Sequence, residues 1–282
     1  MSPVTLDVVM LLGGLVILAF AADRFVVSAA RLSRVWGVSP VVVGALIVGM
    51  GTSAPELLVS VLAALEGDAN LAIGNAVGSN VSNVTLVIGV TALVAPLTGS
   101  ARVLRREGIA MLVAVVVLTV LVYDLELTRL EGLGLLAGML VATAFILRWA
   151  RQDAAIGVSS LEQDGPQDIN KAKEAALGVL SLGATLAGAE LLVRGGSSLA
   201  AAMGVGSAFI GMTVVAVGTS LPELATSIAG VRRHEDDLVV GNVLGSNLFN
   251  ALAVAGAAAA INPGTVEARF RVGAVTMVVC AA

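Results

Sequence analysis

The sequence has little of what soluble proteins use for their surfaces and cross-links. Charged residues occupy 13% of the 282 positions and hydrophobic residues 57%, and the mean hydropathy is +0.98. A soluble domain has roughly 25% charged and 45–50% apolar residues, so this composition excludes one. One cysteine, Cys280, excludes an internal disulfide, and one histidine, His234, leaves no pair of soft metal ligands. We therefore expect an integral membrane protein.

Aromatic residues and clustered charges are also scarce. Nine aromatic residues predict thin aromatic belts at the membrane surfaces. A net charge of −4 without a basic or acidic tail argues against a nucleic-acid partner. The residues from Met1 to Val4 carry no positive side chain, and no cleavage site follows the first apolar run. No signal peptide is therefore expected, and the first run should remain as a membrane span.

Apolar runs account for most of the chain, and a run of about 20 residues is enough to cross a bilayer. Their small and branched residues favour closely packed helices, without the alternation typical of a membrane barrel. We expect an all-α integral membrane bundle. The nine runs lie at roughly 6–29, 38–64, 70–95, 108–123, 128–149, 175–200, 205–230, 237–260 and 270–282.

Basic residues are distributed unevenly between the two ends of these runs. Over alternate connections, eleven arginines and lysines fall on one side and four on the other. The side with eleven is expected to face the cytoplasm, which places the N-terminus outside. The eleven are Arg31, Arg34, Arg102, Arg105, Arg106, Arg148, Arg151, Lys171, Lys173, Arg232 and Arg233; the four are Arg129, Arg194, Arg269 and Arg271.

One stretch of the chain occurs twice. Residues 51–89 read GTSAPELLVS…GNAVGSNVSN…G, and residues 218–256 read GTSLPELATS…GNVLGSNLFN…G. Sixteen of these thirty-nine positions are identical at a constant offset of 167. Matches upstream at the same offset, such as Ala22-Asp23 with Ala189-Glu190, extend the repeat to a whole half of the chain.

The number of runs in each half predicts how the halves are oriented. Five runs precede the polar segment between them, and an odd number of helices inverts the second half relative to the first. We expect a first five-helix repeat at 1–150, a flexible cytoplasmic linker at 151–173 and a second repeat at 174–282. The second repeat has four runs, and the partner of the fifth helix would lie at about 295–316 by the offset of 167. The tenth helix is therefore expected to be missing from this chain.

Each repeat places a proline and a glutamate inside an apolar helix. Pro55 and Pro222 lack an N–H, so each leaves a carbonyl one turn earlier unpaired and favours a break in its helix. In a bilayer such groups persist only where they are buried in protein or line a wet cavity. Two hydroxyls and a glutamate beside each break project from about one face. They are Thr52, Ser53 and Glu56 in the first repeat and Thr219, Ser220 and Glu223 in the second.

The next helix of each repeat carries a polar stripe at intervals of four residues. Carboxylates, hydroxyls and amides together make an all-oxygen set, which suits hard cations such as calcium. Two neighbouring carboxylates inside a membrane cannot both remain ionised without a cation or a proton. Calcium, two or more sodium ions, or protons can therefore occupy the site in turn, and this mutual exclusion is the physical basis of antiport. The stripes are Asn75, Ser79 and Asn83, and Asn242, Ser246 and Asn250.

The paired GTSxPE and GNxxGSNxxN blocks resemble the α-repeats of the sodium/calcium exchanger family, within the calcium/cation antiporter superfamily, over essentially the whole chain. This resemblance implies ten helices, a central diamond of cation sites and calcium export driven by sodium entry across an inner or plasma membrane. It also implies that Glu56 and Glu223 bind calcium, with the carbonyls of Gly49 and Ala216 as weaker candidates. The residues implied to help bind sodium are Thr52, Ser53, Ser79, Asn83, Thr219, Ser220, Ser246 and Asn250.

The coupling ion stays open at this point. A proton-driven calcium antiporter is the closest alternative, because adjacent carboxylates also bind protons, and a potassium-dependent exchanger is another. Some microbial family members have an aspartate at the end of one block, where this chain has Asn83 and Asn250. Two carboxylates balance one calcium ion or two sodium ions, so a third sodium ion would move net charge.

Other classes of protein fit less well. A channel is disfavoured because paired glutamates in inverted repeats suit alternating access, and a hydrolase because the sequence has no nucleophile and base set. We expect a non-enzymatic transporter whose partners are calcium, sodium and the lipid bilayer, acting as a monomer without a prosthetic group. Asp23 beside Arg24, and Glu190 beside Arg194, are expected to form ion pairs or snorkelling arrangements at the membrane surface, and His234 is expected in a solvated loop.

Overall fold

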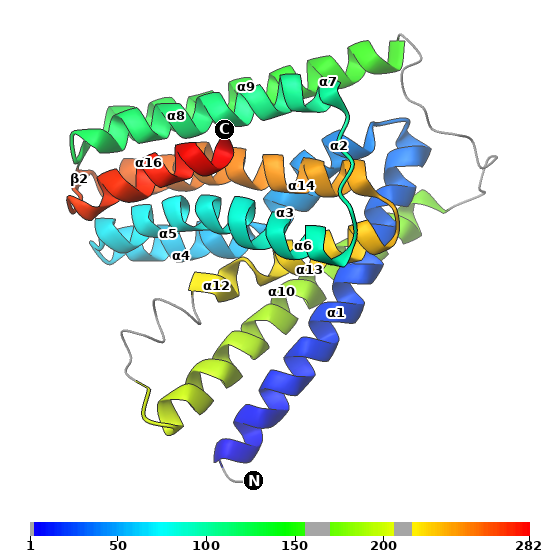
Figure 1. Cartoon of the computed structure of the whole chain (residues 1–282), viewed down its shortest axis with the longest axis horizontal. Helices are drawn as coiled ribbons and strands as arrows, with labels where there is room; N and C mark the ends of the chain where they lie inside the picture. Colours follow the sequence, from blue (N-terminus) through cyan, green and yellow to red (C-terminus); the bar gives the residue numbers. More distant parts are fainter. Residues whose placement is uncertain (1–2, 156–169, 206–215) are drawn as a thin grey trace.

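The computed structural model describes residues 3–155, 170–205 and 216–282, which fold almost entirely into helices (Figure 1). Three spans of the first half contain a π-helical turn, labelled η. The elements of this half are α1 (Pro3–Trp36), α2 (Pro40–Val43), η1 (Gly44–Gly49), α3 (Met50–Thr52), α4 (Ala54–Leu65), α5 (Ala69–Ser82), η2 (Asn83–Val87), α6 (Ile88–Val94), α7 (Ala101–Val103), η3 (Leu104–Gly108), α8 (Ile109–Tyr123), β1 (Glu126–Leu127) and α9 (Arg129–Ala155).

The helices of the second half repeat the order of those in the first, whereas strand β2 precedes the fourth span of its half and β1 follows the fourth span of the first half. Of the predicted linker, residues 156–169 lie outside the described residues. The elements are α10 (Lys171–Ala202), α12 (Ala216–Thr219), α13 (Leu221–Arg232), α14 (Asp236–Phe249), η5 (Asn250–Val254), α15 (Ala255–Ile261), β2 (Gly264–Thr265) and α16 (Arg269–Ala281).

Seven of the nine predicted membrane runs coincide with these helices. Among the described residues, six helices are long and apolar enough to cross a membrane, or seven if the pair Pro40–Thr52 and Ala54–Leu65, bent by 44°, is one span. The two other predicted runs are the one at 205–230, where residues 206–215 lie outside the described residues, and the one at 270–282, where α16 has 13 residues. The expected all-α membrane architecture is confirmed.

Contacts between loops sort the connections into two groups. At one end, Arg34 pairs with Glu235, and Thr98 donates a hydrogen bond to Asp236. At the other end, β1 pairs with β2 in antiparallel register, with Glu126 opposite Thr265. Alternate connections therefore meet at the same end, as an up-and-down order of spans requires. Which end faces the cytoplasm stays a prediction from the loop charges.

A long antiparallel pair, α1 with α10, joins the two halves along one side of the molecule (Figure 1). Glycines let the two backbones touch. A Cβ atom on Gly14 would lie 2.6 Å from the amide nitrogen of Leu192, and one on Gly188 would lie 2.6 Å from that of Leu18. Small residues at such crossings are typical of helices packed inside membranes.

We expect Gly14→Ala to destabilise the protein, because the new methyl group would overlap backbone atoms that cannot rotate away. Overpacking of this kind costs about 1–3 kcal/mol. Thermal unfolding of the purified protein in detergent measures the loss. The neighbouring Gly13→Ala is the matched control, because a Cβ atom there meets nothing within 4 Å in the described part of the chain. Equal stability of the two variants would contradict this packing.

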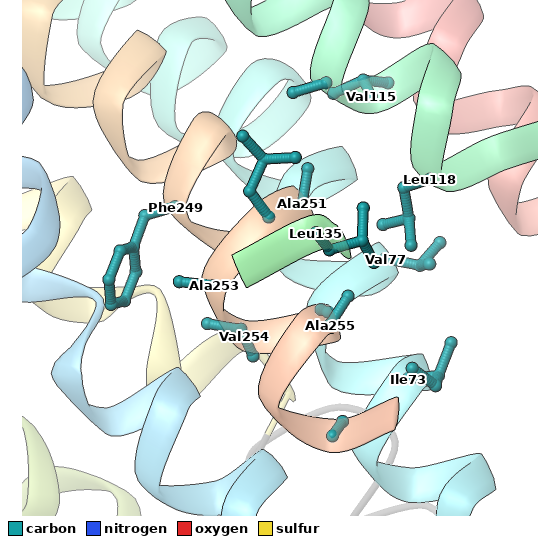
Figure 2. Packing of buried hydrophobic residues seen from close by; sticks show 14 of the residues in the cluster. Ile73, Val77, Val115, Leu118, Leu135, Phe249, Ala251, Ala253, Val254 and Ala255 are labelled. Atoms are coloured by element: carbon teal, nitrogen blue, oxygen red, sulfur yellow. The ribbon is translucent and has the colours of Figure 1, made fainter. Parts of the chain in front are cut away.

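A cluster of buried hydrophobic residues surrounds the helix formed by α14, η5 and α15. Its small residues, including Ala251, Val254 and Ala255, pack against Val115 of α8 and Leu135 of α9 (Figure 2). The α14–α15 span is almost wholly buried, whereas only about a third of its repeat equivalent, α5 to α6, is buried. The two repeats thus share their order of helices but differ in how deeply they are buried.

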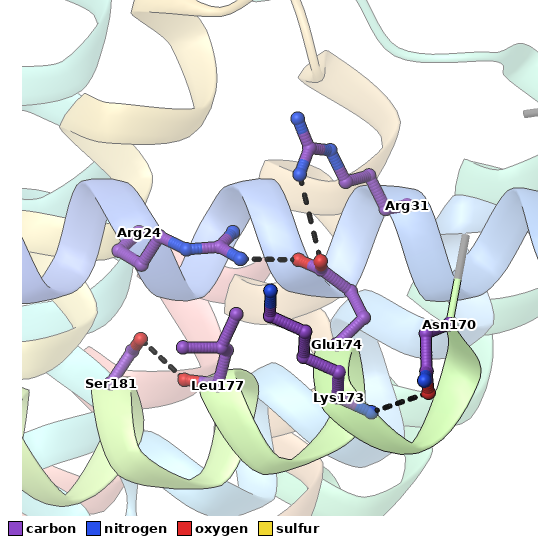
Figure 3. Close-up of polar contacts among 7 residues, drawn as sticks. All are labelled: Arg24, Arg31, Asn170, Lys173, Glu174, Leu177 and Ser181. Atoms are coloured by element: carbon purple, nitrogen blue, oxygen red, sulfur yellow. Dashed lines mark hydrogen bonds and ion pairs between the residues drawn. The ribbon is translucent and has the colours of Figure 1, made fainter. Parts of the chain in front are cut away.

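Ion pairs at the start of α10 attach it to α1. Glu174 lies between Arg24, at 2.7 Å, and Arg31, at 3.5 Å (Figure 3). Arg24 is therefore not the partner of Asp23, which bonds Arg233 instead. The expectation of an Asp23–Arg24 pair was wrong because packing of α1 against α10 and α13 offers each side chain a closer partner.

The structure agrees with two further expectations for charged residues. Glu190 pairs with Arg194 one helical turn later, as the sequence predicts. His234 is exposed in the connection before α14, with a backbone φ of 58°.

Candidate functional site

The predicted breaks occur at the same place in both repeats. Ser53 separates α3 from α4 with φ −82° and ψ 10°, and Ser220 separates α12 from α13 with φ −85° and ψ 4°. Each proline then occupies one of the first two positions of the restarted helix, where its missing N–H costs no helical hydrogen bond. Glu56 and Glu223 therefore lie in the first turn of their restarted helices.

Both glutamates are fully buried, with 0% of their surface exposed. They lie close enough to interact electrostatically, although they come from opposite halves of the chain. The neighbouring Thr52, Ser53 and Ser220 are at most 1% exposed. An ionised carboxylate in a membrane interior costs several kcal/mol unless other groups compensate its charge. Two such groups side by side therefore mark this site as functional.

Hydrogen bonds cross between the repeats at this point. Ser53 Oγ donates to Glu223 Oε1 at 2.7 Å, and Ser246 Oγ donates to the carbonyl oxygen of Gly49 at 3.2 Å. Thr219 lies beside the carboxylate of Glu56. Each repeat thus donates hydrogen bonds to polar groups of the other, so the site exists only when the two halves are packed together.

Several buried polar atoms at the site have no hydrogen-bond partner in the described part of the chain. They are both carboxylate oxygens of Glu56, Oε2 of Glu223 and Oγ of Ser220. A buried oxygen without a donor costs about 1–3 kcal/mol, and more when it carries charge. Each of these oxygens has lone pairs for a cation. The donor set therefore fits a hard cation as transported substrate.

The asparagines that end each stripe begin a π-helical turn. Asn83 starts η2 and Asn250 starts η5, at equivalent positions of the two repeats. Single π-helical turns are often found at functional sites. Asn83 donates to Asn247 at 3.1 Å, while its own Oδ1 and both polar atoms of Asn250 lack a partner among the described residues. Ser79 and Ser246, one turn earlier, are also buried.

The side-chain nitrogen of the first asparagine of each stripe braces its own repeat, while the Oδ1 of Asn242 also accepts a hydrogen bond from Thr52 at 3.4 Å. Asn75 Nδ2 donates to the carbonyl of Glu56 and to Ser60 Oγ, both at 2.9 Å. Asn242 Nδ2 donates to Ser227 Oγ at 3.1 Å, which is the same bond at the offset of 167. These bonds hold each glutamate-bearing helix against the polar stripe that follows it.

The carbonyls of Gly49 and Ala216, the two backbone groups predicted as weaker calcium ligands, have different surroundings. The carbonyl of Gly49 accepts hydrogen bonds from the Ser53 amide at 3.0 Å, Ser246 at 3.2 Å and Thr52 at 3.3 Å. It is therefore already well supplied with donors. Ala216 is the first residue of α12 and follows the segment 206–215, which lies outside the described residues.

Sequence reasoning left out one pair of asparagines. Asn80 and Asn247 occupy the third position of each GSN triplet and are 1% exposed. Asn247 bonds Asn83 directly, whereas Asn80 contacts Met277. Their identity in both blocks was the available signal. The described residues hold no cluster of three or more His, Cys, Asp or Glu side chains, so two carboxylates and neutral oxygens make up the site.

A helical membrane protein with a buried two-carboxylate site where two inverted halves meet belongs to the secondary transporters of hard cations. The family model described as "Sodium/calcium exchanger protein" matches residues 6–148 and 173–282. The chain belongs to the sodium/calcium exchanger family. It is thus a multi-pass membrane antiporter for calcium and other cations, and its family is one of transporters, not of enzymes.

Relatives and solved structures agree with this assignment. Inner membrane protein YrbG of Escherichia coli (strain K12) is 38% identical over 262 residues, covering 92% of this chain and 81% of the relative. Sodium/calcium exchanger MaX1 of Methanosarcina acetivorans is 31% identical over 289 residues, covering 90% of this chain and 82% of the relative. A structure of the sodium-calcium exchanger NCX_Mj, soaked with Na⁺ and Sr²⁺, has a TM-score of 0.85 and 31% identity over 99% of this chain and 89% of that one.

Proposed function

We propose that this protein exchanges calcium for sodium by alternating access at the site between its repeats. The bond of 2.7 Å from Ser53 of the first repeat to Glu223 of the second is the main observation in support. It joins the two halves at one of the two buried carboxylates. A shift of one repeat against the other would therefore change the ligand set, and with it the side from which ions reach the site.

Charge balance supports exchange rather than uniport. Glu56 and Glu223 carry two negative charges when ionised, and one calcium ion or two sodium ions neutralise them. When the protein changes its access state, an empty site with two negative charges would have to be closed off from water in a low-dielectric interior, which is costly. The protein therefore changes its access state most easily when the site is loaded, and loading by calcium and by sodium exclude each other.

The finer assignments follow the same reasoning. Glu56 and Glu223 would hold calcium, with a carbonyl oxygen from Ala216 and one from Gly49, which would give up part of its present hydrogen bonding to the ion. The hydroxyls and amides predicted from the two blocks would complete sodium sites on either side. We further propose that the repeats at 1–150 and 174–282 are the units that move, that the cytoplasmic linker at 151–173 joins them, and that the chain works as a monomer. The protein would lie in the inner or plasma membrane with its N-terminus outside.

Uptake of radiolabelled calcium into proteoliposomes tests the coupling ion. We expect rapid uptake when the vesicles are loaded with sodium, and little uptake when choline replaces sodium inside. Abolishing a proton gradient with an ionophore should leave the sodium-driven uptake unchanged, as should removing potassium. Calcium uptake that occurs without sodium and follows an imposed proton gradient would contradict the proposal and indicate proton coupling. Uptake that also requires potassium would indicate a potassium-dependent exchanger.

A further inference from the structure

An apolar groove lies outside the cation site, lined by residues of α13, α1 and α10. It has a volume of about 820 Å³. We call it the α13 groove. Its apolar wall includes Leu15, Leu18, Phe20, Leu192, Leu224 and Ile228.

The groove has a charged end. Asp23, Arg232 and Arg233 line it there, so two arginines face one carboxylate. Arg233 bonds Asp23 through both of its oxygens, at 2.5 and 2.6 Å, and this hydrogen bonding raises the pKa of Arg233 further. Arg232 forms no ion pair within the described part of the chain and is exposed. The end of the groove therefore keeps one uncompensated positive charge.

The dimensions of the groove match one leaflet of a bilayer. The helix from Leu221 to Arg232 has 12 residues, which is about 18 Å at 1.5 Å per residue. Half of a hydrocarbon core of about 30 Å is about 15 Å. Leu221 lies two residues before the buried Glu223, and Arg232 lies at the end of the helix where the loop charges accumulate. The groove thus runs from the depth of the ion site to one membrane surface.

The other repeat shows that this combination is not a consequence of the fold. At the offset of 167, Arg232 and Arg233 correspond to Leu65 and Glu66 at the end of α4. Ala225, which lines the groove, corresponds to the larger Leu58. The second repeat therefore combines a smaller side chain in the wall with basic residues at the end, while the first repeat has neither.

We propose that the α13 groove binds an anionic phospholipid, with an acyl chain along α13 and the headgroup phosphate at Arg232. Anionic lipids are concentrated in the cytoplasmic leaflet, which the loop charges place at this end. An arginine also suits phosphate recognition, because its planar fork donates two parallel hydrogen bonds. The bound lipid would contact α13, the helix that carries Glu223, together with α1.

Native mass spectrometry of the full chain, titrated with phosphatidylglycerol or phosphatidylcholine, tests this proposal without depending on transport. We expect tighter binding of phosphatidylglycerol. Arg232→Gln should weaken that binding about five-fold, which is the effect of one basic side chain at an anionic surface. The affinity for phosphatidylcholine should stay the same. Ala225→Leu, which introduces the larger residue of the other repeat into the groove, should weaken the binding of both lipids. Arg105→Gln, an exposed arginine at the same end but outside the groove, is the matched control.

Three results would overturn the proposal. Unchanged phosphatidylglycerol affinity in Arg232→Gln would show that the headgroup is not bound at this arginine. Unchanged affinity for both lipids in Ala225→Leu would show that the acyl chain does not lie in the groove. Equal displacement of the lipid by inorganic phosphate would show an anion site without a lipid site. Because the measurement records lipid binding alone, its outcome does not depend on whether the protein exchanges calcium for sodium or for protons.

Discussion

Glu56→Gln and Glu223→Gln are each expected to reduce calcium exchange at least about 100-fold. Each change keeps the shape of the side chain but removes one of the two negative charges of the buried site that we propose for calcium. Removing one partner of a buried charge interaction typically costs about 3–5 kcal/mol, and 1.4 kcal/mol corresponds to a factor of ten. Initial rates of calcium uptake into sodium-loaded proteoliposomes measure the loss.

Glu66→Gln is the matched control for both variants. It makes the same chemical change at an exposed position that follows the end of α4, so its uptake rate should equal that of the unmodified protein. Binding of calcium to the detergent-solubilised variants separates a lost site from a blocked movement. Normal uptake in both buried variants would show that calcium is carried elsewhere, and the proposed site would have to be abandoned.

Gly245→Ala is expected to disrupt both the fold and transport. A Cβ atom on Gly245 would lie 2.2 Å from the carbonyl oxygen of Ala45 and 2.4 Å from its Cα atom. These are backbone atoms of η1, so α14 and η1 must separate, and the expected loss exceeds the usual cost of about 1–3 kcal/mol for overpacking. The separation would also break the bond between Ser246 and Gly49 beside the glutamates. Thermal unfolding and calcium uptake measure the two effects.

Gly134→Ala serves as the control for this prediction. Gly134 lies in α9, and within the described residues a Cβ atom there meets nothing within 4 Å. Alanine is the better helix former by about 1 kcal/mol, so this variant should be at least as stable as the unmodified protein. A Gly245→Ala protein that unfolds at the same temperature as Gly134→Ala would show that α14 and η1 are not in backbone contact.

The repeat and the chemistry of the site were predictable because they depend on local sequence. A proline followed by a glutamate inside an apolar run determines where a helix breaks and what it buries, and both breaks occur at the serine before these residues. The constant offset of 167 relates the two halves without any knowledge of their packing. Which of the hydroxyls and amides bind sodium stays a prediction.

Contacts between the halves were not predictable in the same way. The expected Asp23–Arg24 pair was wrong because a neighbour in sequence was taken as the partner, whereas Asp23 bonds Arg233 on α13. Asn247 was omitted although it is identical in both blocks, because its role depends on Asn83 in the other repeat. Such partners are separated by more than 160 positions, and nothing in the local pattern of either residue identifies the other.

The sequence by itself determined the membrane environment, the duplication, the helix breaks and the two carboxylates in a hydrophobic setting. These properties follow from hydropathy, from the missing N–H of proline and from the identity of repeated residues. Only the tertiary structure decided that Ser53 reaches Glu223, that glycines bring α1 against α10, and that a groove with a basic end lies beside α13. Those features depend on how two inverted halves dock, and the free energy of docking is spread over many weak contacts that no single motif encodes.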